Sequence, residues 1–160
     1  MTRDEPTGTT GESAGGSDGR AASTTGGTYT LVIDLPEPTV LSVGALGDHR
    51  FPAGAYAYTG SALGTGGFAR VDRHRRVAAG EHDVRHWHVD HLLGHSETRI
   101  DRVIESAGAD VECVVAGRLP EGPVDGFGSS DCGCVSHLST APDVGALADL
   151  AVRAHGAATE

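Results

Sequence analysis

Tyrosines and arginines gather in one short part of the sequence. Two of the three tyrosines of the chain, Tyr56 and Tyr58, lie in the segment AYAYTGSALGTGGFARVDRHRR, residues 55–76. Four of the twelve arginines fall within seven residues of the same segment, at positions 70, 73, 75 and 76. A guanidinium group offers phosphate oxygens a planar fork of donors. A phenol can deprotonate water once a metal or another cation lowers its pKa. The combination raises the hypothesis of a phosphate-binding site.

The same arginines also allow a plainer interpretation, a helix face that only contacts solvent, which is the usual fate of a run of charges. The rest of the chain makes that interpretation less natural. The whole chain has 22 acidic residues, no lysine and a net charge of −10. This balance resembles that of salt-adapted, halophilic proteins, in which acidity is a background property of the surface. Near molar salt the Debye length is about 3 Å, so a local cluster of arginines is more informative than the total charge.

The chain is long enough for one domain preceded by a tail. Residues 1–26 are rich in Gly, Ser and Thr without apolar periodicity, and we expect them to be a disordered acidic tail. Residues 27–156 then form the domain. No apolar h-region of a signal peptide and no apolar run long enough to span a membrane is found in the sequence, so we expect a soluble, cytoplasmic protein with no membrane partner.

The pattern of apolar residues predicts an α+β domain, a small antiparallel sheet flanked by helices. Strands are expected at residues 27–35, 39–46 and 55–62, with a turn at 47–54. Helices are expected at 68–79, near 89, at 109–119 with Asp110 as a possible N-cap, and at 142–156. Residues 97–106 fit a helix or a strand, and 120–138 are expected to be irregular. In the first helix, Phe68 and Val71 mark the buried side, and Arg70, Arg73, His74 and Val77 a different face.

Two short motifs resemble the signature of the GIY-YIG nuclease superfamily. Gly27-Thr28-Tyr29 matches its first part, and Tyr58-Thr59-Gly60 matches its second part, about thirty residues further on. Threonine stands where the signature has isoleucine, at positions whose expected role is packing. The segments FPAGAYAYTGSA, RVDRHRR, HWHVDHLL, VEC and GFGSSDCGCVSHL are similar to a small, uncharacterised family of GIY-YIG-like domains common in archaea.

The resemblance implies the superfamily's small antiparallel sheet flanked by helices, and cleavage of phosphodiester bonds in nucleic acid. It implies that Tyr29 orients or deprotonates water and that Tyr58 holds the phosphate or the water. Arg70 stands at the family's helix arginine, and His74, one turn later, would relay a proton or contact the phosphate. Tyr56 is interpreted as a packing residue. Substrate binding is assigned to Gly60, Ser61, Arg73, Arg76 and His88.

The resemblance further implies one divalent cation, Mg²⁺ or Mn²⁺, held by a glutamate on a helix. Glu112 is the best match, and a single carboxylate with waters is normal for Mg²⁺. The superfamily's late asparagine has no match in this sequence. Six of the nine histidines lie between residues 74 and 95, in a spacing that matches no recognised metal motif. His86, Trp87, His88 and Asp90 are therefore interpreted as structural residues or as the rim of the substrate site.

Three cysteines raise the question of a second metal. An odd number in a chain without an export signal argues against a disulfide framework, which leaves free thiols or a metal site. Cys132, Cys134 and His137 follow a C-x-C-x2-H spacing, and Cys113 could complete a Cys3His set for structural Zn²⁺. Small buried thiols are the alternative.

We therefore expect a metal-dependent endonuclease acting on DNA or RNA. Two other classes stay open. One is a nucleic-acid-binding module that kept the scaffold and lost cleavage. The other is a zinc-stapled domain that mediates protein contacts.

Overall fold

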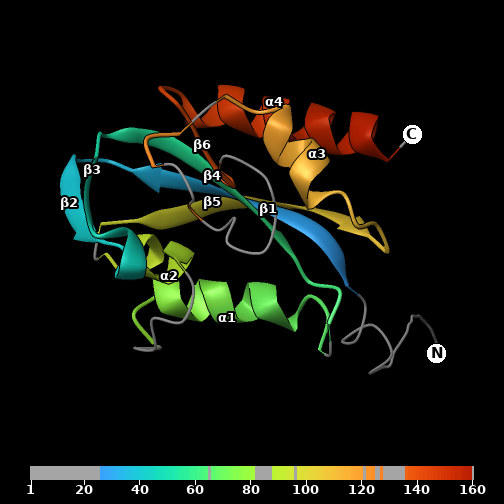
Figure 1. Ribbon diagram of the computed structural model, residues 1–160, viewed down its shortest axis with the longest axis horizontal. Helices are drawn as coiled ribbons and strands as arrows, with labels where there is room; N and C mark the ends of the chain where they lie inside the picture. The colour runs from blue at the N-terminus through green and yellow to red at the C-terminus, as the bar shows by residue number, and fades with distance from the viewer. Residues whose placement is uncertain are drawn as a thin grey trace, which may run out of the picture.

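A four-stranded antiparallel sheet separates two layers of helices (Figure 1). The computed structural model describes residues 26–64, 66–81, 88–95, 97–120, 122–124, 127 and 136–159. The strands are β1 (Gly27–Leu35), β4 (Gly54–Ser61), β5 (Arg99–Ala107) and β6 (Leu138–Ala141), in the order β5-β1-β4-β6. This is the α+β architecture predicted from the sequence.

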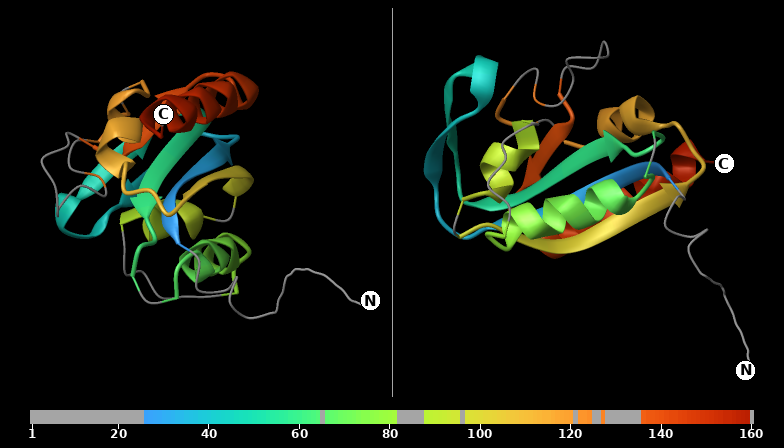
Figure 2. Two further views of the ribbon diagram at one scale, coloured as in Figure 1. Left: turned by 90° about the vertical axis from the view of Figure 1, so that its right-hand side faces the viewer. Right: turned by 90° about the horizontal axis from the view of Figure 1, so that it is seen from below.

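Helices cover both faces of the sheet, as the side views show (Figure 2). On one face lie α1 (Ala69–Ala78) and α2 (His88–Leu93), and on the other lie α3 (Glu112–Gly117) and α4 (Val144–Ala158). Because side chains alternate along a strand, the central strand β1 supplies both layers. Leu31 and Ile33 pack in the core with α1 and α2, and Val32 packs in the core with α3 and α4.

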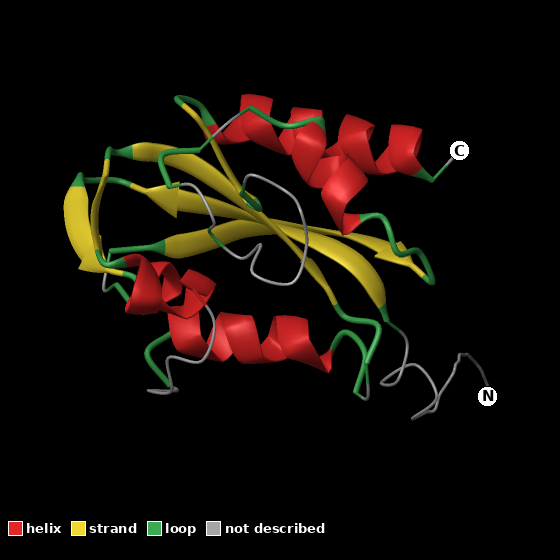
Figure 3. Ribbon diagram, in the orientation of Figure 1, coloured by secondary structure: helices red, strands yellow, loops and turns green. Residues whose placement is uncertain are grey.

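A small hairpin extends from one end of the sheet (Figure 3). It consists of β2 (Thr39–Ser42) and β3 (Asp48–Phe51), joined through a 3₁₀ turn at Gly44–Leu46. The expected strand at 39–46 therefore ends early, and the expected turn at 47–54 contains a strand. Among the described residues, no helix is long and apolar enough to cross a lipid bilayer.

The later strands and helices agree less closely with the elements expected from the sequence. The ambiguous segment 97–106 is the edge strand β5, and the segment expected to be irregular ends at β6, which pairs with β4. α3 is shorter than predicted, and its N-cap is Val111, not Asp110. α4 is confirmed, with the side chain of Asp143 accepting a hydrogen bond from the backbone N of Ala146 at 2.7 Å.

The first helix is confirmed, but its expected division into faces is wrong. Val71, His74 and Val77 are all buried on the side of α1 that packs against the sheet. Phe68, expected on the buried side, is only half-buried at the N-cap. One and two turns after Arg70, the helix therefore directs a histidine and a valine inward, and that histidine enters the candidate site.

Candidate active site

The two tyrosine motifs lie side by side on adjacent strands. In the pairing of β1 with β4, Tyr29 stands opposite Gly60, and Leu31 stands opposite Tyr58. A Cβ atom at Gly60 would lie 2.7 Å from the hydroxyl of Tyr29 and 2.8 Å from its Cζ. Glycine is therefore required at position 60 so that the ring of Tyr29 can lie across the backbone of the neighbouring strand.

Tyr29 contacts His74 of α1 in the buried layer between sheet and helix. The phenol oxygen lies 2.7 Å from Nε2 of His74, and both residues are almost completely buried. Burial lowers the pKa of His74 to about 4, although the Asp90 carboxylate acts in the opposite direction. His74 is consequently neutral near pH 7, and a neutral imidazole has one nitrogen able to accept a proton.

Tyr58 lies beside this pair. Its ring centroid is 6.3 Å from that of Tyr29 and 6.1 Å from that of His74. Burial, followed by the charge of Glu112, raises the pKa of Tyr58 above that of an exposed phenol. Tyr56, two residues earlier on the same strand, is also buried and donates a hydrogen bond to the carbonyl of Pro52, which agrees with a packing role.

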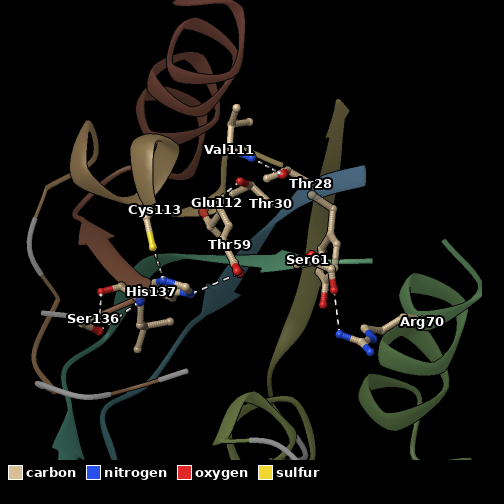
Figure 4. Close-up of polar contacts among 12 residues, drawn as sticks. Thr28, Thr30, Thr59, Ser61, Arg70, Val111, Glu112, Cys113, Ser136 and His137 are labelled. Carbon is tan, nitrogen blue, oxygen red and sulfur yellow. Dashed lines mark hydrogen bonds and ion pairs between the residues drawn. The ribbon is translucent and has the colours of Figure 1, made fainter. Parts of the chain in front are cut away.

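Arg70 reaches the site from the first turn of α1 (Figure 4). Its Nη1 donates a hydrogen bond to the carbonyl oxygen of Ser61 at 2.6 Å. Burial raises the pKa of Tyr29 well above its usual value, and the charge of Arg70 and its hydrogen bond to the phenol act to lower it. Arg70 is thus the cation that faces the phenol of Tyr29, an orientation the sequence motif predicts.

Glu112 comes from the opposite layer and is held in place by the first motif. The hydroxyl of Thr28 donates to the carbonyl of Ala109 at 2.8 Å and accepts from the backbone N of Val111 at 3.0 Å (Figure 4). These bonds fix the chain immediately before Glu112 to β1. The charge of Glu112 raises the pKa of both Tyr29 and Tyr58. Its partly exposed side chain is a single carboxylate, a donor set that suits a hydrated Mg²⁺ ion.

The two motif threonines, Thr28 and Thr59, make hydrogen bonds rather than only packing contacts. Thr59 is buried and bonds Thr30 at 2.9 Å, and Thr30 bonds Nε2 of His155 in α4 at 2.8 Å. Ser106 bonds the other nitrogen of His155 at 2.7 Å. The expectation of a packing role was therefore incomplete, because hydroxyl groups at these positions take part in buried polar contacts behind the site.

Cys113 and His137 lie next to Glu112 on the side away from Arg70 (Figure 4). The Sγ of Cys113 is 3.7 Å from Nε2 of His137, and Nδ1 of His137 is 3.6 Å from Oε2 of Glu112. Cys113 is disulfide-bonded, whereas the sequence favoured free thiols or a metal site. Cys132 and Cys134, the other proposed zinc ligands, lie outside the described residues. Within those residues, no group of three or more His, Cys, Asp and Glu side chains is arranged to hold a metal ion.

The residues assigned to substrate binding lie in different settings. The two terminal nitrogens of Arg73 bind the carboxylate of Asp90 at 3.0 and 3.1 Å, so this arginine has a structural partner that the sequence did not indicate. Arg76 is exposed on the outer face of α1. His88 is half-buried and packs edge-on against Phe127, with ring centroids 5.7 Å apart. Burial lowers the pKa of His88. His86 and Trp87 lie outside the described residues.

An open pocket of about 400 Å³ lies elsewhere, near the beginning of β4. Pro52, Tyr56 and Pro123 line it together with the end of β6. None of the predicted site residues that the structure describes lines this pocket. The structure therefore gathers Tyr29, Tyr58, Arg70, His74 and Glu112 in a different place, toward the other end of β4.

The fold and this constellation together define a class: a single α+β domain with a buried phenol–imidazole pair beside one guanidinium and one carboxylate. The chain belongs to the DUF123 family, described as a domain of unknown function, whose family model matches residues 28–159. No curated protein and no solved structure matches the chain.

Proposed function

We propose that this protein is a metal-dependent nuclease of the GIY-YIG type, which hydrolyses phosphodiester bonds in DNA or RNA. The observation that carries the proposal is the 2.7 Å contact between the phenol of Tyr29 and Nε2 of His74, with Arg70 facing the same phenol. Hydrolysis of a phosphodiester needs a base for the attacking water and positive charge beside the phosphate. Both are brought together in this site.

The chemistry starts from a protonated Tyr29, because burial raises the pKa of its phenol. A neutral His74 accepts the phenol proton on Nε2 while the phenol oxygen takes a proton from the attacking water. The hydroxide oxygen then bonds to phosphorus, and the bond from phosphorus to the leaving oxygen breaks. The leaving oxygen keeps the electron pair and takes a proton from solvent water, and His74 returns its proton to solvent, which restores the neutral imidazole. Arg70 binds the phosphate through its guanidinium N–H groups, and Tyr58 holds the phosphate or the water from the neighbouring strand.

A divalent cation, Mg²⁺ or Mn²⁺, would be held by the carboxylate of Glu112. Bound there, it would supply a Lewis acid for the phosphate and the leaving oxygen. Zn²⁺ fits less well in this state of the molecule, because the sulfur of a disulfide-bonded Cys113 is not the thiolate that zinc binds. Structural zinc at Cys113 and His137, with Cys132 and Cys134, remains a proposal for the reduced chain, to be tested by elemental analysis of protein purified without a His-tag.

A cleavage screen tests the proposed function. The full chain is incubated in high KCl with nicked, flapped and single-stranded substrates of DNA and RNA, in Mg²⁺, Mn²⁺ or EDTA. We expect metal-dependent products, and we expect Arg70→Ala to slow cleavage at least about hundredfold. Arg153→Ala is the matched control, since Arg153 is exposed on α4, across the sheet from α1. Equal rates for wild type and Arg70→Ala would refute the assignment.

The second candidate is a nucleic-acid-binding module without cleavage. The raised pKa values of Tyr29 and Tyr58 favour it, because a phenol with a raised pKa gives up its proton less readily. It predicts that the same substrates are bound in EDTA and that no product forms with any metal.

A further inference from the structure

Asp90 lies behind His74, completely buried in α2. The guanidinium of Arg73 holds its carboxylate through both terminal nitrogens. A buried ionised carboxylate is costly unless it is paired and hydrogen-bonded, and this bidentate contact supplies that pairing. The carboxylate is thereby fixed in one orientation, with Oδ1 4.0 Å from Nδ1 of His74, a distance too long for a hydrogen bond but short enough for the charge to act on the ring.

His74 therefore has a phenol on one ring nitrogen and a carboxylate on the other. A neutral imidazole carries its proton on one of the two nitrogens, and the surroundings decide which one. If the proton were on Nε2, the lone pair of Nδ1 would face the negative charge of Asp90. With the proton on Nδ1, the N–H faces that charge favourably, and Nε2 accepts the hydrogen bond of Tyr29.

We infer that Asp90 is a positioning residue, which holds the proton of His74 on Nδ1 so that Nε2 is the acceptor for the proton of Tyr29. Its contribution to cleavage rests on the proposed function, whereas its effect on the tautomer does not. When the phenol proton moves to Nε2, His74 becomes an imidazolium, and the Asp90 carboxylate stabilises that charge. The order carboxylate, imidazole, hydroxyl is that of a catalytic triad, but here the carboxylate acts on Nδ1 through its charge at 4.0 Å and not through a hydrogen bond.

Other charged groups face His74 as well. From α1, the guanidinium groups of Arg73 and Arg70 act against its protonation, and from α2 the carboxylate of Asp90 favours it. Tyr29 of β1 and Tyr58 of β4 lie against the ring as uncharged phenols. Asp90 is thus the negative group that opposes burial and the two arginines, and its removal would lower the pKa of His74 further.

The tautomer of His74 can be read by NMR. Long-range ¹H–¹⁵N spectra of protein labelled with ¹⁵N-histidine distinguish a protonated from an unprotonated ring nitrogen, and His74→Gln assigns the signal. We expect wild type to carry the proton on Nδ1. In Asp90→Asn the negative charge that faces Nδ1 is lost, so we expect the share of His74 that carries its proton on Nε2 to rise. Asp101→Asn, an exposed position on β5, should leave the signal unchanged, and Asp90→Glu, which retains the charge, should keep the proton on Nδ1.

Cleavage supplies the second readout. Asp90→Asn is expected to lower kcat by about a hundredfold to ten-thousandfold, as loss of the orienting carboxylate does in triads, and to move the acid limb of the pH–rate profile to lower pH. A merely structural role would reduce the amount of folded protein without moving that limb. An Nε2 proton in wild type, or an unchanged tautomer in folded Asp90→Asn, would overturn the inference. If Asp90→Asn does not fold, the wild-type spectrum still decides. Absence of cleavage by wild type would refute the proposed function alone.

Discussion

The position of one side chain in this site depends on the size of its neighbour, and Gly60 shows this most directly. The ring of Tyr29 occupies the space in which a side chain at position 60 would lie. The motif spacing in the sequence predicted that these two residues belong to one site. It could not predict that the glycine is needed for room, because that follows only from the register of β1 against β4.

Gly60→Ala is therefore expected to displace the phenol of Tyr29. Forcing a Cβ to within 2.7 Å of the hydroxyl should cost about 1–3 kcal/mol in the free energy of unfolding, measured by urea denaturation. Gly64→Ala is the matched control, since a Cβ at Gly64 would meet no atom within 4 Å. Equal stabilities of the two variants would contradict the packing described.

Other residue-scale features had no signal in the sequence. The pairing of Arg73 with Asp90 joins residues on two helices, and the run of arginines around it suggested substrate binding instead. The disulfide bond of Cys113 was also not anticipated, because an odd count of cysteines in a chain without an export signal argued against disulfides.

At the scale of elements, strongly patterned segments were predicted and short ones were not. β1 carries an unbroken apolar and β-branched run, and α4 carries a full amphipathic pattern with a capping aspartate, so both were predicted nearly to the residue. β3 and β6 have four residues each and no pattern of their own. β3 forms by pairing with its hairpin neighbour β2, and β6 by pairing with the distant strand β4, so each depends on its partner strand more than on its own sequence.

The polar contacts between the sheet and α4 make a prediction at this scale. Thr30→Val removes the hydroxyl that bonds both Thr59 and Nε2 of His155, and it leaves those buried groups without that partner. We expect a loss of about 1–3 kcal/mol in the free energy of unfolding, measured by urea denaturation. Thr39→Val on the hairpin should change stability by less than about 0.5 kcal/mol. If Thr30→Val matched that control, these contacts would not contribute to stability.

Across the whole molecule, histidines are buried on both faces of the sheet. Burial lowers the pKa of His74, His137 and His155, so the unfolded chain binds more protons than the folded one below about pH 6.5. The stability associated with these buried neutral histidines is complete above that pH and is lost as the pH falls. The acidic composition of the chain predicted a surface adapted to salt, whereas this acid sensitivity arises from the interior and could only be found in the fold.

His74 should account for a measurable part of that sensitivity. The pKa of His74 in the folded protein is about 4. Protonation of His74 in the unfolded chain should therefore lower the free energy of unfolding by up to about 3 kcal/mol between pH 6.5 and pH 4. Urea denaturation at constant high KCl, from pH 7.5 to 4.5, should show a shallower pH dependence for His74→Gln than for wild type. The same slope in both proteins would show that His74 is not buried in its neutral form.

The central claim is that the phenol of Tyr29 takes part in phosphodiester cleavage, and one pair of substitutions tests it most directly. Tyr29→Phe and Tyr56→Phe each remove one buried hydroxyl from the sheet face that packs against α1, but only the first hydroxyl contacts His74. Single-turnover cleavage with Mg²⁺ should be at least about hundredfold slower in Tyr29→Phe and unchanged in Tyr56→Phe. Equal rates for Tyr29→Phe and wild type would contradict the account.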